Sequence, residues 1–390
     1  MPTPALVALL PLVVAFSTTA FLVPQVRRFA VEWKLGDKPN GRKLHAQAIP
    51  HLGGVAIFGG FFLALLVLLA TPFGMPHATR ILALLPGLLV VFGLGLVDDL
   101  RGLRAGVKLL YQLVGAVCIV AMGGGLWSGS LSDPVFFLTL AMSVFWYVGV
   151  CNSVNLIDGL DGLAAGVAVI AAAAFLAVGL RLGDTAVVLL ALGLIGSLLA
   201  FLRFNFHPAL IFMGDTGSMF LGFTLAFLVC LLVPRLGFWT ALLGGATVLG
   251  LPIVDTATAI CRRLASGRHI FAADGEHIHH KLLRLGLSHR RAVLLLYGLA
   301  ALFAALGSGI LLGHPRLFLL AVALGASVPL GITSLSQRTP ARQEPSPVST
   351  RRLVGAPSTQ GAEPRPVSQE PEERRREPVL AEVPPTSGRR

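Results

Sequence analysis

Residues 163–180 read LAAGVAVIAAAAFLAVGL and residues 184–202 read DTAVVLLALGLIGSLLAFL, with only Arg-Leu-Gly between them. Each run has about the 20 mostly apolar residues that a helix needs to cross a bilayer. The short break predicts a turn at Arg181–Thr185 between two membrane-spanning helices. These two runs therefore indicate an all-α integral membrane protein.

The composition of the whole chain agrees with that class. Of its 390 residues, 55% are hydrophobic and only 13% are charged, whereas soluble domains carry about 25% charged residues. We predict about eleven transmembrane helices within one membrane domain at residues 1–337. The predicted segments are 4–25, 52–71, 80–97, 108–125, 134–152, 163–180, 184–202, 217–234, 238–260, 291–312 and 316–335.

The distribution of Lys and Arg predicts the orientation. The odd-numbered connections and their edges carry 17 of the 31 basic residues, whereas the even-numbered ones carry 4. Cytoplasmic loops of membrane proteins are enriched in Lys and Arg. We therefore expect the N-terminus outside, and the odd-numbered connections and the C-terminal tail in the cytoplasm.

The C-terminal residues 338–390 differ from the rest, being rich in Pro, Arg, Glu and Ser with almost no aromatic residues. Such a composition cannot bury enough apolar surface to fold, which predicts a disordered tail. The tail and the orientation pattern account for the net charge of +12. Nucleic acid is therefore not an expected partner.

Acidic residues gather at the predicted cytoplasmic ends of the apolar segments. The outer connections contain only Asp133 and Asp184. Several close carboxylates repel one another unless a cation joins them, and oxygen ligands favour Mg²⁺, with Mn²⁺ as the alternative. The acids concerned are Asp98, Asp99, Asp158, Asp161 and Asp215.

The ninth connection supplies the opposite charge. It contains Arg262 and Arg263, followed by His277, His279 and His280. Arginine is a natural clamp for a diphosphate, and histidine can donate a hydrogen bond to phosphate. Zinc on the three histidines is the alternative, but no further Cys or His completes a familiar ligand set. Acids, basic groups and a bilayer together suggest phosphoryl transfer that involves a lipid.

Four motifs in order carry a family resemblance over about residues 35–290. They are Asp98-Asp99 with Lys108, Asn152–Gly162 (NSVNLIDGLDG), Gly214–Ser218 (GDTGS) and His277–His280 (HIHH). The chain resembles the polyprenyl-phosphate N-acetylhexosamine-1-phosphate transferases, the group that includes WecA, TagO and MraY. Ile278 interrupts the three consecutive histidines typical of MraY, so the resemblance favours the WecA/TagO branch and UDP-GlcNAc as donor.

The resemblance implies a reaction in the bacterial plasma membrane. A polyprenyl phosphate would attack the β-phosphate of a UDP-N-acetylhexosamine, releasing UMP and starting a cell-envelope polysaccharide. Direct in-line attack is favoured here over double displacement through an aspartate, because a phosphate monoester is largely dianionic at neutral pH. Transfer of phospho-MurNAc-pentapeptide and membrane transport are the rival functions, and the protein could assemble as a homodimer.

The resemblance also implies roles for individual residues. Asp215 would bind Mg²⁺, and Asp98 and Asp99 would lie at the reacting phosphates, one of them as base or nucleophile. Two larger groups would bind the substrates. The nucleotide-sugar group is Asn155, Asp158, Asp161 and, by a looser match, Lys43 and His45; the phosphate group is Lys108, Arg262, Arg263, His277, His279 and His280.

Overall fold

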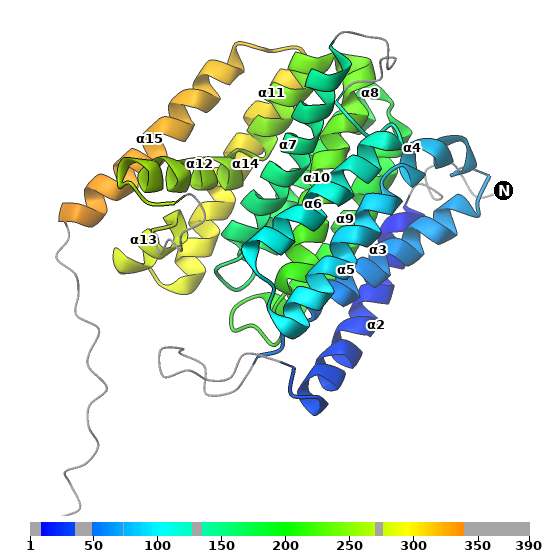
Figure 1. Cartoon of the computed structure of the whole chain (residues 1–390), viewed down its shortest axis with the longest axis horizontal. Helices are drawn as coiled ribbons and strands as arrows, with labels where there is room; N and C mark the ends of the chain where they lie inside the picture. Colours follow the sequence, from blue (N-terminus) through cyan, green and yellow to red (C-terminus); the bar gives the residue numbers. More distant parts are fainter. Residues whose placement is uncertain (1–8, 36–48, 73, 127–134, 270–275, 339–390) are drawn as a thin grey trace, which may run out of the picture. The chain divides into compact units, whose positions relative to one another are not determined.

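The computed structural model describes residues 9–35, 49–72, 74–126, 135–269 and 276–338 (Figure 1). They belong to the first of two units, Met1–Arg342 and Gln343–Arg390. Apart from Arg338, the predicted tail lies outside the described residues, and so do Lys43 and His45. The tail's disorder and the roles of these two residues therefore stay predictions.

All regular structure in the described residues is helical, as predicted. The helices are α2 (Leu10–Glu32), α3 (Gly53–Leu69), α4 (Ala78–Leu82), α5 (Leu85–Arg101), α6 (Ala105–Ala121), α7 (Phe136–Ile157), α8 (Leu163–Leu182), α9 (Thr185–Asn205), α10 (Gly214–Leu236), α11 (Phe238–Val248), α12 (Gly250–Ala265), α13 (Ile278–Arg284), α14 (His289–Leu311) and α15 (Leu317–Arg338). A short 3₁₀ helix at Met75–His77 precedes α4.

Among the described residues, seven helices are long and apolar enough to cross a membrane, or up to nine if each of two bent pairs is one span. The apolar helices α3 and α6 are shorter. Each predicted segment overlaps a helix or a bent pair. The structure is therefore consistent with an integral membrane protein, whereas the number eleven and the orientation stay predictions.

The α8–α9 pair has the predicted hairpin form. Gly183 follows α8 with a φ of 64°, a left-handed conformation that suits glycine. Asp184 then caps α9, because its side chain accepts a hydrogen bond from the Val187 N–H at 3.3 Å. Helix α8 therefore ends at Gly183, and α9 begins directly after Asp184.

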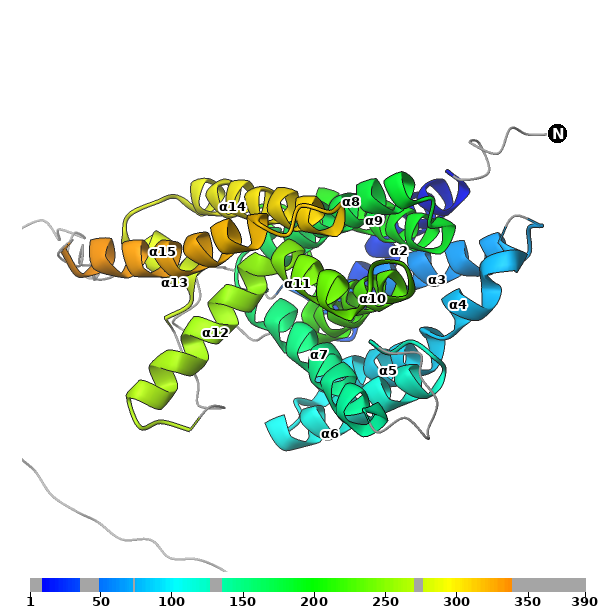
Figure 2. The ribbon, with the colours of Figure 1, turned by 90° about the horizontal axis from the view of Figure 1, so that it is seen from above.

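The expectation of one helix over residues 238–260 is wrong. The segment breaks at Leu249 into α11 and α12, which are bent by 84°. Pro252 lies in the first turn of α12, where its missing N–H costs nothing, whereas inside a continuous helix it would interrupt the hydrogen bonds. Figure 2 shows α12 projecting away from the packed helices.

Helix α10 lies at the centre of the bundle (Figure 2), and its most apolar 18-residue window is entirely buried. In a bilayer such burial reflects close packing, which small residues allow. A β-carbon at Gly222 would overlap the Cys151 backbone, so glycine lets α10 approach α7 closely. The first turn of α10 thereby meets the ends of α5 and α7.

Candidate active site

The predicted acidic residues meet where three helices end or begin. Asp98 and Asp99 lie in the last turn of α5, Asn155 in the last turn of α7, and Asp215 in the first turn of α10. Asp158 directly follows α7. We call Asp98, Asp99, Asp158 and Asp215 the carboxylate cluster.

Asp99 caps the N-terminus of α10 from the neighbouring helix. Its carboxylate accepts hydrogen bonds from the Asp215 N–H at 2.7 Å, the Thr216 N–H at 3.0 Å and the Thr216 hydroxyl at 2.5 Å. The first N–H groups of a helix lack partners within it, and negative charge is favourable there. A β-carbon at Gly214, where φ is 72°, would overlap the His51 carbonyl. Asp99 and Gly214 therefore fix where Asp215 lies.

Lys108 of α6 joins the two remaining acids of this junction. Its ammonium group forms ion pairs with Asp98 and, at 2.7 Å, with Asp215. The Asn155 amide donates to Asp215 Oδ1 and to the Ser218 hydroxyl, both at 2.9 Å. The Lys108 ammonium group, a cation, is therefore held by both Asp98 and Asp215.

Asp158 adds a fourth carboxylate whose charge is disfavoured. Burial raises its pKa to about 7, and repulsion by Asp215, Asp99 and Asp161 adds to the shift. Within the described residues, contacts and charges thus bring four carboxylates together with one lysine. The carboxylate oxygens gathered here are hard ligands that suit Mg²⁺.

The histidine motif reaches the carboxylate cluster through Gly159. A β-carbon at Gly159 would overlap the ring of His279, which is 2% exposed. Burial lowers the pKa of His279 to about 3, with further lowering by the neighbouring His280. The ring is therefore neutral at physiological pH, and it lies against the residue that follows Asp158.

His277 lies parallel to His279, with ring centroids 5.8 Å apart and an angle of 4° between their planes. The ligand atoms of His277, His279 and His280 do not all lie within 4.8 Å of one another, so the geometry does not favour zinc on these histidines. His277 contacts Asp255 of α12 at 2.8 Å.

Asp161 lies in a different environment from its neighbour Asp158. Its carboxylate contacts His207 Nδ1 at 2.7 Å and accepts from the Ala209 N–H at 3.1 Å. Ligand atoms of Asp161, His207 and His289 lie within 4.8 Å of one another. The His207 and His289 rings stack, with centroids 4.2 Å apart and an angle of 15° between their planes. Here Asp161 ties the loop after α7 to the segment after α9.

The remaining predicted residues, Arg262 and Arg263, form the half-buried last turn of α12. Sequence reasoning assigned no role to Thr216, Ser218 or Asp255. The signal for the first two was present, because both hydroxyl residues stand beside Asp215 in the GDTGS motif. Asp255 gave no such signal, because its partner is 22 residues away.

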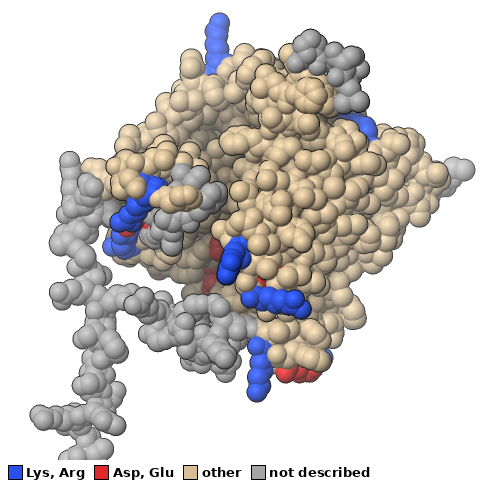
Figure 3. Space-filling view, in the orientation of Figure 1, with Lys and Arg blue, Asp and Glu red and all other residues tan. Residues whose placement is uncertain are grey.

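A cavity of about 400 Å³ opens beside the C-terminal end of α5. It is lined by Lys34, Leu35, His51, Leu52, Asp98, Asp99, Leu100 and Gly102. In Figure 3, charged side chains on the visible face gather at the left and in the lower part of the view, and most of the remaining surface is uncharged. The cavity reaches Asp98 and Asp99.

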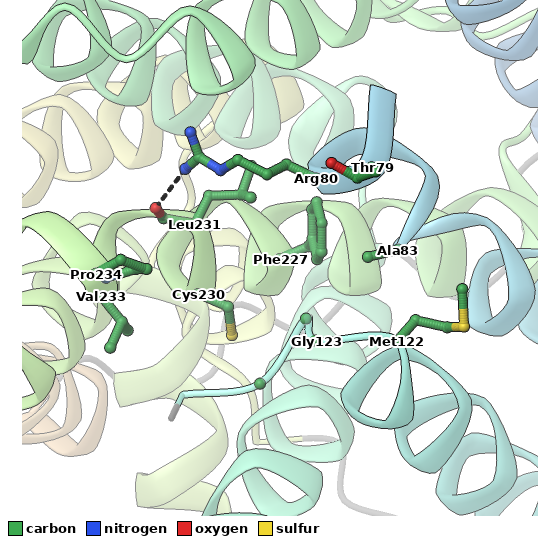
Figure 4. Close-up of a pocket in the computed structure, with 12 residues that line it drawn as sticks. Thr79, Arg80, Ala83, Met122, Gly123, Phe227, Cys230, Leu231, Val233 and Pro234 are labelled. Carbon is green, nitrogen blue, oxygen red and sulfur yellow. Dashed lines mark hydrogen bonds between the residues drawn. The ribbon is translucent and has the colours of Figure 1, made fainter. Parts of the chain in front are cut away.

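A second charged cluster lies at the C-terminal end of α10, where α4 and the turn before α9 meet it. The Arg80 guanidinium donates to both Asp184 oxygens, at 3.1 and 3.0 Å, and Arg235 donates to Asp184 at 3.0 Å. Arg80 also donates to the Leu231 carbonyl at 2.9 Å, beside a cavity of about 380 Å³ (Figure 4). We call Arg80, Asp184 and Arg235 the Asp184 cluster.

These features define an all-helical protein, consistent with an integral membrane protein, in which a cluster of carboxylates lies where helix ends meet. The model of glycosyl transferase family 4 matches residues 81–233, which contain the carboxylate cluster and Lys108. The chain belongs to this family, as its similarity to characterised relatives shows.

One relative, the probable undecaprenyl-phosphate N-acetylglucosaminyl 1-phosphate transferase of Bacillus subtilis, is 38% identical over 75% of this chain and 82% of its own length. The decaprenyl-phosphate N-acetylglucosaminephosphotransferase of Mycobacterium tuberculosis is 34% identical over 81% of this chain and 85% of its own. The undecaprenyl-phosphate alpha-N-acetylglucosaminyl 1-phosphate transferase of Escherichia coli is 30% identical over 74% and 80%. The family predicted from the four motifs is confirmed.

Proposed function

We propose that the protein transfers N-acetylglucosamine 1-phosphate from UDP-N-acetylglucosamine to a polyprenyl phosphate, and that UMP is released. The carboxylate cluster, joined to Lys108 at the start of α10, is the observation that carries this proposal. Relatives that share this region are named as transferases acting on undecaprenyl or decaprenyl phosphate. Their names specify N-acetylglucosamine, which supports this donor over a MurNAc-pentapeptide.

The position of the acids favours an enzyme over a transporter. Transporters place coupling acids near the bilayer midplane. Here Asp98 and Asp215 occupy the last turn of α5 and the first turn of α10. Such helix ends can meet a water-soluble nucleotide sugar and a lipid phosphate together. Because the basic residues gather in the connections at this end, we assign it to the cytoplasmic face of a bacterial plasma membrane.

Asp215, with Asp98 as a neighbouring oxygen ligand, would hold Mg²⁺, which would supply positive charge against the diphosphate of the donor, and Mn²⁺ could replace it. The donor set fits, because Asp215 and Asp98 already share one cation, the Lys108 ammonium group. The two Asp215 oxygens lie between Lys108 and Asn155, which holds the carboxylate in one orientation.

Asp98 and Asp99 have different roles in this scheme. Both Asp99 oxygens accept hydrogen bonds from the first turn of α10, so Asp99 positions Asp215. Asp98 and Asp99 both line the cavity beside α5. Because the Asp99 oxygens accept hydrogen bonds from α10, Asp98, which is paired with Lys108, is the carboxylate left for the reacting phosphates. This division refines the prediction that one of the pair acts as base or nucleophile.

The attack itself needs alignment more than a strong base. A phosphate monoester has a second pKa of about 6, so the lipid phosphate is already nucleophilic at neutral pH. Lys108 would balance charge on the equatorial oxygens during in-line displacement. Asp158 and the neutral His279 would line the sugar-phosphate side, and Arg262 and Arg263 would contact the diphosphate.

The test is transfer of radiolabelled sugar into butanol-extractable lipid by the purified protein. Undecaprenyl phosphate and Mg²⁺ would be supplied with UDP-GlcNAc, UDP-GalNAc or UDP-MurNAc-pentapeptide in parallel. We expect labelled lipid and free UMP with UDP-GlcNAc alone. Label with the pentapeptide donor only would overturn the assigned sugar, and no label with any donor would overturn the transferase.

Rapid quench without the lipid acceptor separates the two mechanisms. Direct attack predicts that no phospho-sugar becomes bound to protein before lipid is added. A labelled aspartyl adduct under these conditions would establish double displacement instead.

A further inference from the structure

Lys34 has an unusual backbone conformation directly after the end of α2. Among the described residues it is the single non-glycine residue with a positive φ, 53°. Its N–H donates to the Val31 carbonyl at 3.1 Å, and the Leu35 N–H donates to the Ala30 carbonyl at 2.8 Å. A helix that ends in this way usually has glycine at the left-handed position, because a side chain is disfavoured there. The helix end alone therefore does not account for a lysine.

Lys34 brings positive charge to the cavity beside α5, which it lines together with Asp98 and Asp99. Two carboxylates repel an approaching phosphate, so a phosphate that binds beside them needs a cation. In the described part of the chain, Lys108 is held by Asp98 and Asp215, whereas no carboxylate pairs with the Lys34 ammonium group. Lys34 is therefore the cation available to a ligand in this cavity.

The surroundings of the cavity favour a lipid phosphate over a nucleotide. Three of the residues that line it are leucines, Leu35, Leu52 and Leu100, and the last of these is 46% exposed. At the end of α2, next to the lysine, Phe29 and Trp33 are exposed, with ring centroids 5.6 Å apart. Exposed aromatic side chains are typical of the membrane–water interface. The cavity therefore lies where a phosphate at the end of an apolar chain can meet the protein.

The donor side of the carboxylate cluster is formed by other elements. Asp158 and His279, which we assign to the sugar-phosphate side, belong to the end of α7 and to α13. The residues that line the cavity come instead from the end of α2, the segment before α3 and the end of α5. Helices α2 and α13 lie on opposite sides of the bundle (Figures 1 and 2). The two substrates can therefore reach Asp98 from different sides.

We propose that Lys34 binds the phosphate of the acceptor lipid in this cavity and holds it beside Asp98. The inference rests on the proposed function, which makes a polyprenyl phosphate the acceptor. The ammonium group of Lys34 offsets the charge of Asp98 and Asp99 while the lipid phosphate approaches the donor. A disfavoured backbone conformation at a binding cavity is then retained for the side chain that it carries.

The decisive variant is Lys34→Gly, which removes the ammonium group and supplies the residue that best suits this backbone. We expect its melting temperature to be no lower than that of wild type. Its KM for undecaprenyl phosphate should rise about ten- to a hundredfold, as for the loss of a hydrogen bond to a charged group. Its KM for UDP-GlcNAc and its kcat should stay unchanged. A lysine that only ends α2 would leave all three constants unchanged, and that result would overturn the proposal.

Two further variants separate the charge from its position. Lys34→Arg keeps both the positive charge and the disfavoured conformation, so its KM for the lipid should stay close to that of wild type. Arg28→Gln is the matched control, because it removes an exposed positive charge from α2 that does not line the cavity. An equal rise in the lipid KM for Arg28→Gln, or a rise in the KM for UDP-GlcNAc alone for Lys34→Gly, would contradict the assignment.

Binding of the lipid without any donor tests the assignment independently of turnover. In native mass spectrometry from detergent with divalent ions removed, the wild-type protein should retain undecaprenyl phosphate in preference to undecaprenol. This preference should be lost in Lys34→Gly and kept in Arg28→Gln. An unchanged preference in Lys34→Gly would sink the proposal. Because the measurement requires no reaction, failure of the transferase assay with every donor is distinguishable from failure of the Lys34 assignment.

Discussion

The Asp184 cluster and the carboxylate cluster lie at opposite ends of α10, yet both join helices through acids and long basic side chains. In the Asp184 cluster, one fully buried carboxylate has two guanidinium partners. In the carboxylate cluster, Lys108 serves both Asp98 and Asp215, and two further acids lie close by. The Asp184 cluster therefore has an excess of positive charge, and the carboxylate cluster has an excess of negative charge.

This difference in charge indicates that the Asp184 cluster stabilises the fold, whereas the carboxylate cluster is suited to binding a cation. A buried acid with two arginines needs no further ligand, and losing it would leave charged partners behind. Close carboxylates with a single lysine repel one another until more positive charge arrives. The contrast predicts that substitutions in the Asp184 cluster change stability, whereas substitutions in the carboxylate cluster change activity.

The largest expected effect is that of Asp215→Ala. We expect label transfer to fall by more than about 10³-fold at every Mg²⁺ concentration tested, because the site loses its central oxygen ligand. The melting temperature should stay near that of wild type once repulsion within the cluster is relieved. Retained turnover would refute the metal-binding role of Asp215.

Asp184→Asn should show the reverse pattern. Breaking a buried ion pair costs up to about 3–5 kcal/mol, and since both arginines are partly exposed we expect about 2–4 kcal/mol. Chemical unfolding in detergent would measure this loss, while kcat at low temperature stays unchanged. The control Arg181→Gln, an exposed residue in the last turn of α8, should change stability by less than about 0.5 kcal/mol. A large fall in kcat for Asp184→Asn would break the contrast.

Gly159→Ala sharpens the comparison on the histidine side. The added methyl group would overlap the His279 ring and displace it. Misplacing a binding group by about 1 Å can cost about 10²-fold in rate, so we expect a loss of ten- to a hundredfold in kcat/KM. Gly93→Ala, where a β-carbon would meet nothing within 4 Å, is the control and should retain activity. Equal activity of the two variants would contradict the contact.

The smallest effect concerns pH. The pKa of Asp158 is raised from 3.8 to about 7, so the folded protein keeps a proton that the unfolded chain releases. Its contribution to stability is therefore present below pH 4 and is lost as the pH rises through 7. Unfolding without divalent ions at pH 5 to 8 should show a weaker pH dependence in Asp158→Asn. An identical dependence in both proteins would show that Asp158 is not the group responsible.

Much of the fold and of the site was predictable because the relevant signals are local. Apolar runs and the Gly183–Asp184 break define helices within a few residues of sequence. The clustering of Asp98, Asp99 and Asp215 follows from their place at helix ends on one predicted side. The GDTGS motif likewise indicated the start of α10.

The remainder depends on contacts between distant segments. Asp99 caps a helix that begins 115 residues later, at Gly214, and no local pattern identifies that partner. Asp161 and Asp158 occupy one motif, but only the fold shows Asp161 held by His207. The bend at Leu249 was signalled by Pro252, although the apolar content of the segment outweighed it. Local chemistry predicts which residues are unusual, whereas packing decides what each one contacts.

Binding of Mn²⁺, followed by electron paramagnetic resonance, tests the central claim most directly. The carboxylate cluster should bind one ion that Mg²⁺ displaces, and binding should be lost in Asp215→Asn but kept in Asp184→Asn. Binding that is absent from the wild-type protein, or equally strong in Asp215→Asn, would contradict the assignment of the carboxylate cluster as the cation site.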